Sequence, residues 1–213
     1  MQRLDDRSRM SGDVHVRFCE SLRGWFPWTT RLVVCFQYKP DAERFREELG
    51  KRLGKFGLEV EPTKTKVMEF GRFAVQNAKR RGQRAETFDF LGLTHYCGKR
   101  RDGTGFRMKR VTARKKFVAK LKIFKEWLRK ARIMKTKELW QIAKAKLKGH
   151  YNYYGVSDNL RGIVRFGREV VKLLFKWLNR RGKKSFNVEK FNEMLKRFPL
   201  PKAWIRVSMF ASP

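Results

Sequence analysis

Apolar residues recur every three or four positions through most of the chain after Thr112. Phe117, Leu121, Phe124 and Leu128 follow this spacing and would form one stripe along a helix. Such a stripe has to be buried against other elements, so this part of the chain is restricted to helices that pack together and whose solvent-facing sides are basic. The opposite side of the same helix is basic and carries Lys115, Lys116, Lys120, Lys122, Arg129 and Lys130.

The same spacing predicts three further helices. The second begins near Thr136, and Asn159 and Asn187 are predicted to cap the third and the fourth. Pro199 and Pro201 end the fourth helix. Four amphipathic helices in succession predict a small bundle. Apolar positions of the last three helices include Leu139, Ile142, Leu147, Leu160, Ile163, Val170, Leu174, Trp177, Val188, Phe191 and Leu195.

The charge of the chain is large and unevenly distributed. Lys and Arg number 53 against 20 Asp and Glu, which gives a formal net charge of +33 and a pI of about 10.9. Residues 63–213 hold 41 of the basic residues and 10 acids, whereas residues 1–62 hold 12 and 10. A hydrophobic fraction of 41% argues against a disordered basic tail. The charge requires an anionic partner, with nucleic acid first and an anionic membrane second.

The first half of the chain mixes strand and helix patterns. Leu32–Phe36 is a β-branched apolar run that predicts a buried strand, and it is far too short to span a membrane. Asp41 is predicted to cap a helix that Gly57 ends, and two short strands, 58–60 and 67–70, follow. Residues 72–85 are predicted to be a basic loop. Residues 88–96 and 106–108 are predicted to form a β-hairpin around the turn at 101–105.

These patterns predict an α+β fold with four parts. Residues 1–31 show neither helical nor strand spacing and are expected to be poorly ordered. Residues 32–110 form a partial sheet with one helix and a β-hairpin. Residues 111–198 form the all-α helical domain, and residues 199–213 form a C-terminal tail.

The positions of the cysteines and carboxylates predict no disulfide bonds and no metal-binding site. Three widely spaced cysteines give no disulfide framework, and Met1–Val14 lacks the apolar core of a signal peptide, so a cytoplasmic location is expected. His95 and Cys97 would supply only two ligands, too few for zinc. Asp5 and Asp6 are interpreted as surface charge. No cofactor is predicted.

The basic helices predict contacts to nucleic acid phosphates, and the three tyrosines between Gly149 and Gly155 offer rings for stacking on unpaired bases. Helix-end packing accounts for most of these rings, so at most one, Tyr151, is assigned to stacking. The predicted RNA-binding residues are Lys109, Arg110, Arg114, Lys115, Lys116, Lys120, Lys122, Lys144, Lys146, Lys148, Tyr151, Arg161, Arg165, Arg168, Arg180 and Arg181.

The chain from Val33 to about Phe191 resembles bacterial group II intron-encoded reverse transcriptase/maturases. The similarity covers about three-quarters of the chain and lies in the order, spacing and type of several motifs. These are Val33–Phe36 with Asp41–Phe45, Gly57–Leu58 with Lys64–Thr65, Phe88–Leu93, Lys148–Val156 and Leu173–Arg181.

The resemblance implies a remnant of a polymerase palm over 32–110 and a thumb, or maturase-specific region, over 111–198. Phe88, Phe90, Leu91 and Gly92 would then belong to the hairpin that positions the primer end. Lys64 would correspond to the family's lysine near the pyrophosphate. The implied partner is group II intron RNA, whose splicing-competent fold the family's thumb and maturase region stabilise; no membrane partner is implied.

The sequence departs from the family at the catalytic turn. Thr30 and Arg31 stand where two magnesium-binding aspartates are expected, and a guanidinium there would repel the metal. The chain is therefore expected to be a truncated or frameshifted C-terminal portion that is catalytically silent alone, with magnesium needed only by the full-length polymerase. One alternative is a reverse transcriptase that acts when a separate fingers/palm fragment complements it. Another is a basic RNA-binding structural protein.

Overall fold

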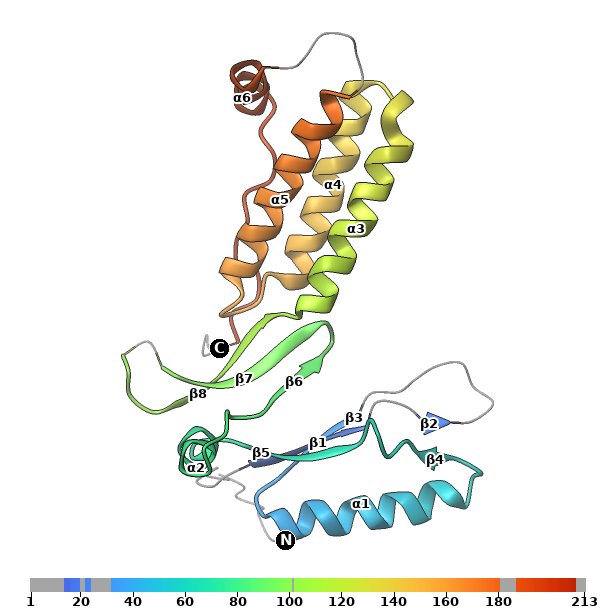
Figure 1. The fold of residues 1–213 in the computed structure, drawn as a ribbon, viewed down its shortest axis with the longest axis vertical. Helices are drawn as coiled ribbons and strands as arrows, with labels where there is room; N and C mark the ends of the chain where they lie inside the picture. The colour runs from blue at the N-terminus through green and yellow to red at the C-terminus, as the bar shows by residue number, and fades with distance from the viewer. Residues whose placement is uncertain (1–13, 20–21, 24–31, 101, 181–186, 210–213) are drawn as a thin grey trace, which may run out of the picture. The chain divides into compact units, whose positions relative to one another are not determined.

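The computed structural model describes residues 14–19, 22–23, 32–100, 102–180 and 187–209. The fold is mixed α+β, as predicted (Figure 1). The chain divides into two compact units. Unit 1 comprises Met1–Phe90 and His95–Met108, and unit 2 comprises Leu91–Thr94 and Lys109–Pro213. The division falls close to the predicted boundary after residue 110.

Unit 1 contains a three-stranded antiparallel sheet in the order β3-β1-β5 (Figure 1). The strands are β1 (Val14–Cys19), β3 (Leu32–Phe36) and β5 (Lys66–Phe70). His15 pairs with Phe36 on one side and with Glu69 on the other. Because β3 and β5 are both antiparallel to β1, they run parallel to each other. A second ribbon pairs β2 (Leu22–Arg23) with β4 (Glu59–Val60).

Strand β1 corrects the expectation for residues 1–31. The expectation overlooked a short alternation there, since Val14, Val16 and Phe18 are separated by His15 and Arg17, and pairing with two neighbours makes β1 the central strand of the sheet. The remaining positions of that segment, including Asp5, Asp6, Thr30 and Arg31, lie outside the described residues. Strand β3 is also less buried than predicted, since it is an edge strand and Leu32 is exposed.

Helix α1 (Lys39–Gly54) connects β3 to the β4 and β5 region. Tyr38, rather than Asp41, occupies the N-cap position, and Pro40 and Asp41 lie in the first turn. Pro is tolerated there because the first amides of a helix have no internal partner, and the carboxylate interacts favourably with the helix dipole. Ala42 is fully buried, and the ring of Phe45 lies 5.2 Å from that of Phe36.

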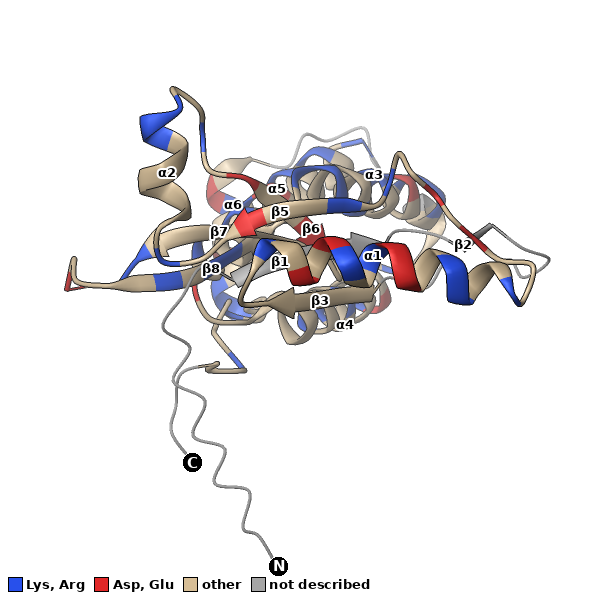
Figure 2. Ribbon diagram, turned by 90° about the horizontal axis from the view of Figure 1, so that it is seen from below, with Lys and Arg blue, Asp and Glu red and all other residues tan. Residues whose placement is uncertain are grey.

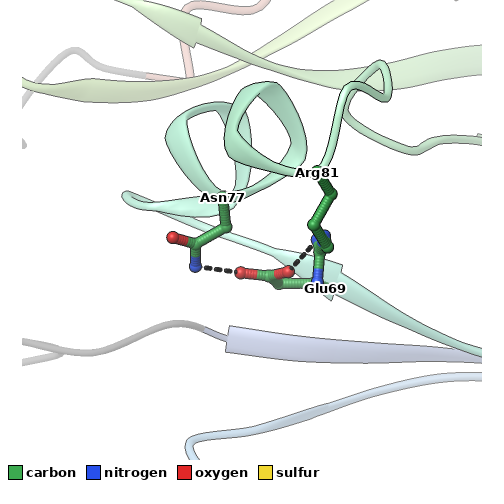
Figure 3. Close-up of polar contacts among 3 residues, drawn as sticks. All are labelled: Glu69, Asn77 and Arg81. Atoms are coloured by element: carbon green, nitrogen blue, oxygen red, sulfur yellow. Dashed lines mark hydrogen bonds and ion pairs between the residues drawn. The ribbon is translucent and has the colours of Figure 1, made fainter.

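A short helix, α2 (Ala74–Arg80), replaces the predicted loop at 72–85. Glu69 on β5 fixes it, because its carboxylate accepts hydrogen bonds from Asn77 Nδ2 and Arg81 Nη2, each at 2.5 Å (Figure 3). Ala74 and Ala78 are the buried residues of the helix. These two hydrogen bonds attach the helix to β5.

The predicted hairpin is a three-stranded sheet in the order β6-β7-β8. Its strands are β6 (Thr87–Phe90), β7 (Leu93–Lys99) and β8 (Phe106–Thr112). The run predicted as one strand over 88–96 is broken at Leu91–Gly92, where both residues have positive φ, 49° and 78°. Unit 1 has its own apolar core, made by the buried residues Met68, Phe70 and Phe88.

Unit 2 contains the predicted helical bundle (Figure 1). Its three long helices are α3 (Arg114–Lys130), α4 (Thr136–Tyr154) and α5 (Leu160–Leu178), followed by the shorter α6 (Val188–Arg197). A 3₁₀ turn at Ala131–Ile133 links α3 to α4. The predicted stripes form one core whose buried members include Phe124, Leu128, Leu147, Ile163, Val170, Leu174, Trp177 and Phe191.

Asn159 precedes α5 as predicted, but its side chain does not cap the helix. The residue is 0% exposed, and its side chain joins the end of β8 to the end of α4. Oδ1 accepts a hydrogen bond from the Thr112 amide at 2.8 Å, while Nδ2 donates to Thr112 Oγ1 and to the Tyr154 carbonyl, each at 2.8 Å. Gly162 permits this arrangement, because a Cβ there would collide with the Asn159 side chain.

The segment after α6 is docked rather than a loose tail. Trp140 Nε1 donates to the Phe198 carbonyl at 2.9 Å where the segment begins. Near its end, the Val207 amide donates to the Gly155 carbonyl at 3.0 Å, and the Ser157 amide donates to the Val207 carbonyl at 3.1 Å. Leu200, Ala203 and Ile205 pack against the helical core between these points. The segment thus covers part of the bundle.

Candidate nucleic-acid interface

The first half of α3 presents a dense cationic face. Arg114, Lys115, Lys116, Lys120 and Lys122 are all exposed. The helix buries Phe124 and Leu128 on its other side, so the apolar stripe that anchors it also directs these cations to solvent. Glu126 is the sole acid in the helix, and it follows the cationic group in sequence. This face therefore carries positive charge that its own helix does not neutralise.

Helix α1 shows what an ordinary solvated face looks like in the same protein. Its cations alternate with acids, as the mixed colours of the helix in Figure 2 show. Lys39 pairs with Glu43 at 3.4 Å, and Lys51 pairs with Glu48 at 3.0 Å. Exposed pairs at this spacing stabilise a helix slightly and cancel its field. A helix face that is only solvated can carry acids beside its cations, as α1 does. The near absence of acids on α3 therefore supports a polyanion partner for that helix.

Helix α5 carries a second row of cations, which we call the α5 ladder. Its members are Arg161, Arg165, Arg168, Lys172 and Lys176, and all are exposed. Steps of three or four residues place them on one side, about one per 5.4 Å turn, over about 22 Å of helix. Glu169 is the single acid in α5 and pairs with Lys172 at 2.9 Å. A regular row of this kind matches the repeating charge of a nucleic acid backbone.

The ladder includes two residues that the sequence analysis missed, Lys172 and Lys176. Their signal was present in the spacing, since they continue the three-to-four step from Arg161 through Arg168. Aromatic rings lie under several predicted cations. The guanidinium of Arg165 lies 5.2 Å from the Phe117 ring centre, and Lys146 Nζ lies 5.1 Å from that of Trp127. Such contacts restrict a long side chain while its charge stays available.

Two of the predicted RNA-binding residues are buried. Arg110 is 7% exposed and Tyr151 is 5% exposed, so little of either side chain reaches the outer surface. Tyr151 lies on the inner side of α4, where its spacing from Leu147 puts it in the core. Tyr153 is the exposed ring of this group, at 56%, and its hydroxyl donates to the Leu91 carbonyl at 3.0 Å.

The other predicted residues divide by exposure. Lys109 and Lys144 are half-buried, whereas Lys146, Lys148 and Arg180 are exposed. Arg180 additionally lies over the Trp177 ring, with 5.2 Å between its guanidinium carbon and the ring centre. Arg181 lies outside the described residues. The structure thus assembles an exposed basic set on α3, α4 and α5 within one unit.

The residues that the resemblance assigns to a polymerase are placed as follows. Phe88 is buried and stacks on His95 at 4.7 Å, and Phe90 is half-buried. Leu91 is exposed at the turn, while Gly92 is buried there and its carbonyl accepts a hydrogen bond from the Ala113 amide at 3.0 Å. Lys64 is exposed in the turn before β5. Their roles remain predictions.

Titratable groups in the core of unit 2 are held in their neutral forms. Burial, and secondarily the charge of Lys120, lowers the pKa of His150 to about 4. The imidazole stacks on Phe166 with 3.5 Å between ring centres. Burial raises the pKa values of Tyr151 and Tyr154. These three side chains therefore pack as neutral rings and do not add to the surface charge.

Within the described residues, no group of three or more His, Cys, Asp or Glu side chains is placed to hold a metal ion. Nor does any helix among them have the length and apolarity needed to cross a membrane. No known protein family, curated protein or solved structure matches the chain. The basic faces of α3 and α5 are the candidate interface that the described residues present.

Proposed function

We propose that this protein binds structured RNA through unit 2, and that its RNA is a group II intron whose splicing-competent fold it stabilises. The observation that carries the proposal is the excess of cations over acids on the α3 face and the α5 ladder, set against the paired charges of α1. Cations that neutralise phosphates release counterions, which makes this binding favourable and strongly dependent on salt.

The choice of intron RNA rests on the resemblance to intron-encoded maturases. Its motifs Lys148–Val156 and Leu173–Arg181 lie largely on α4 and α5, and α5 also carries the ladder of exposed cations. Under this proposal unit 1 is a palm remnant without its own polymerase activity. Thr30 and Arg31, at the positions expected for catalytic aspartates, support that silence.

Charge reversal on α3 tests the RNA-binding part of the proposal. Lys115, Lys116 and Lys120 are changed together to Glu, and the matched control reverses three exposed cations of α1: Arg44, Arg46 and Arg52. The α3 variant should bind RNA more weakly, and the slope of log affinity against log salt should fall by about 0.7 to 0.9 for each phosphate that the variant no longer neutralises. Equal effects of the two variants would show that only net charge matters and would refute a specific face.

A splicing assay tests the intron part. The protein is added to a self-splicing group II intron transcript at low magnesium, and to an unrelated structured RNA of equal length in a parallel binding measurement. The expected result is faster splicing and preferential binding of the intron at equal salt. RNA binding without either effect would support the alternative of a basic RNA-binding structural protein.

A further inference from the structure

A largely apolar groove lies in unit 2 between α4, α5 and the docked C-terminal segment. Its volume is about 520 Å³, within the range of about 300–1,000 Å³ typical of small-ligand pockets. Helix α4 contributes Leu147 and Tyr151, and α5 contributes Val164 and Val171. Ala203 of the C-terminal segment lines the opposite side. The groove exists because that segment packs along the bundle.

Three cations line this groove, and one of them, Lys172, is paired with Glu169 at 2.9 Å. Arg168 and Lys172 come from α5, and Lys202 comes from the C-terminal segment. All three side chains are exposed, and the described residues that line the groove include no Asp or Glu. An occupant that fits this chemistry has a flat or apolar part for the interior and a negative charge for the edge.

Arg168 and Lys172 also belong to the α5 ladder, so the groove opens beside the row of cations that would follow an RNA backbone. A strand tracked by the ladder brings its bases within reach of the apolar lining. We propose that the groove receives one unstacked base of the bound RNA while Arg168, Lys172 and Lys202 contact the flanking phosphates. This inference rests on the proposed RNA binding and adds a structural preference to it: RNA with a bulged or looped nucleotide over fully paired RNA.

The expected preference for RNA with a bulged nucleotide has a physical reason. A bulged base is already unpaired, so moving it into an apolar site costs little, whereas a paired base must first be extruded. Proteins commonly read RNA at such unpaired positions. The ladder alone would contact phosphates of both kinds of RNA equally, so only the groove distinguishes them.

Three RNAs of identical length test the proposal with the full chain: a perfect duplex, the duplex with one bulged adenosine, and the duplex with an abasic bulge. The adenosine bulge should bind about tenfold more tightly than the abasic one, as expected for a base held by stacking or apolar contact. Because the two bulged RNAs share one backbone shape and charge, the comparison isolates the base.

Filling the groove should remove this advantage. Ala203→Leu and Val164→Phe each add bulk to the lining without changing charge, and both are expected to equalise the two bulged RNAs while leaving duplex affinity within about twofold. Ala145→Leu on the exposed face of α4 is the matched control and should keep the advantage. An advantage that persists in both groove variants overturns the proposal.

Photo-crosslinking supplies a measurement that needs no variant. A 4-thiouridine placed at the bulge should crosslink to α5 or to the segment around Ala203. Crosslinking confined to the exposed Tyr153 would overturn the groove and assign the base to that ring instead.

The outcomes separate this inference from the proposed function. If wild-type protein binds none of the RNAs in a salt-dependent way, the proposed function itself fails. If it binds all three equally, RNA binding stands and base insertion is refuted. Binding of anionic lipid vesicles that Ala203→Leu abolishes, with RNA binding unchanged, would identify a lipid occupant and refute base insertion as well.

Discussion

Asn159 should be among the most sensitive positions for the stability of unit 2. Its side chain satisfies three backbone or hydroxyl groups that lie 5 to 47 residues away in sequence, from a site with no exposed surface. Asn159→Ala removes all of these bonds and admits no solvent to replace them. The Thr112 amide and the Tyr154 carbonyl are then deprived of the partners that Asn159 provides.

The expected cost follows from those two groups. Each buried polar group left without a partner costs about 1–3 kcal/mol, so the change should lower the free energy of unfolding by about 2–6 kcal/mol. That is a large part of the 5–15 kcal/mol typical of a folded protein, as an order of magnitude. Asn192→Ala on the exposed face of α6 is the matched control and should change stability by less than about 0.5 kcal/mol.

Urea denaturation measures this destabilisation. Circular dichroism reports the loss of helix, and tryptophan fluorescence reports the unfolding of unit 2. Asn159→Asp gives a second, pH-dependent readout. It keeps an acceptor for the Thr112 amide but buries a carboxylate, whose pKa burial would raise. Its destabilisation should therefore shrink as the pH falls and the carboxyl is protonated. A decrease below about 1 kcal/mol for Asn159→Ala would refute the reasoning, because it would mean that water or a shifted backbone replaces these bonds.

Three further predictions concern the pH response, the C-terminal segment and catalysis. Because burial lowers the pKa of His150 from 6.5 to about 4, the unfolded chain binds the proton first as the pH falls. The free energy of unfolding should then be independent of this group above pH 6.5 and should decline by up to about 3 kcal/mol towards pH 4. Denaturation curves of His150→Phe should lack this decline. A chain ending at Phe198 lacks the packing of Leu200, Ala203 and Ile205 and should unfold at a lower temperature in calorimetry; an unchanged transition would mean that the segment does not stabilise the bundle. Primer extension by the purified chain with magnesium should be undetectable, given Thr30 and Arg31, and any product would restore the polymerase alternative.

The helices of unit 2 were predictable because their signal is local. Apolar residues at helical spacing specify both the helix and its buried side, and α3, α4, α5 and α6 begin close to the predicted positions. The exposed cations follow directly, since the residues opposite a buried stripe face solvent. For this reason most of the predicted basic surface on α3 and α5 is confirmed as exposed, although its RNA contacts stay a prediction.

The sequence-based predictions were wrong where the structural state of a residue depends on contacts with residues elsewhere in the chain. Tyr151 and Tyr153 are two positions apart in the same motif, yet one is buried and the other exposed, because the packing of α5 selects which side of α4 is inside. Strand β1 has a short alternating run, but its central place in the sheet depends on pairing with β3 and β5. Helix α2 is attached to β5 through Glu69, which precedes it by several residues.

The sequence by itself determined that this protein has a helical unit with an uncompensated basic surface, because charge and apolar spacing are properties of neighbouring residues. Only the tertiary structure decided that Asn159 joins Thr112 to Tyr154 instead of capping its own helix. It likewise decided that the C-terminal segment docks and forms a groove beside the α5 ladder. Both features arise from contacts between residues far apart in the chain, which local patterns do not encode.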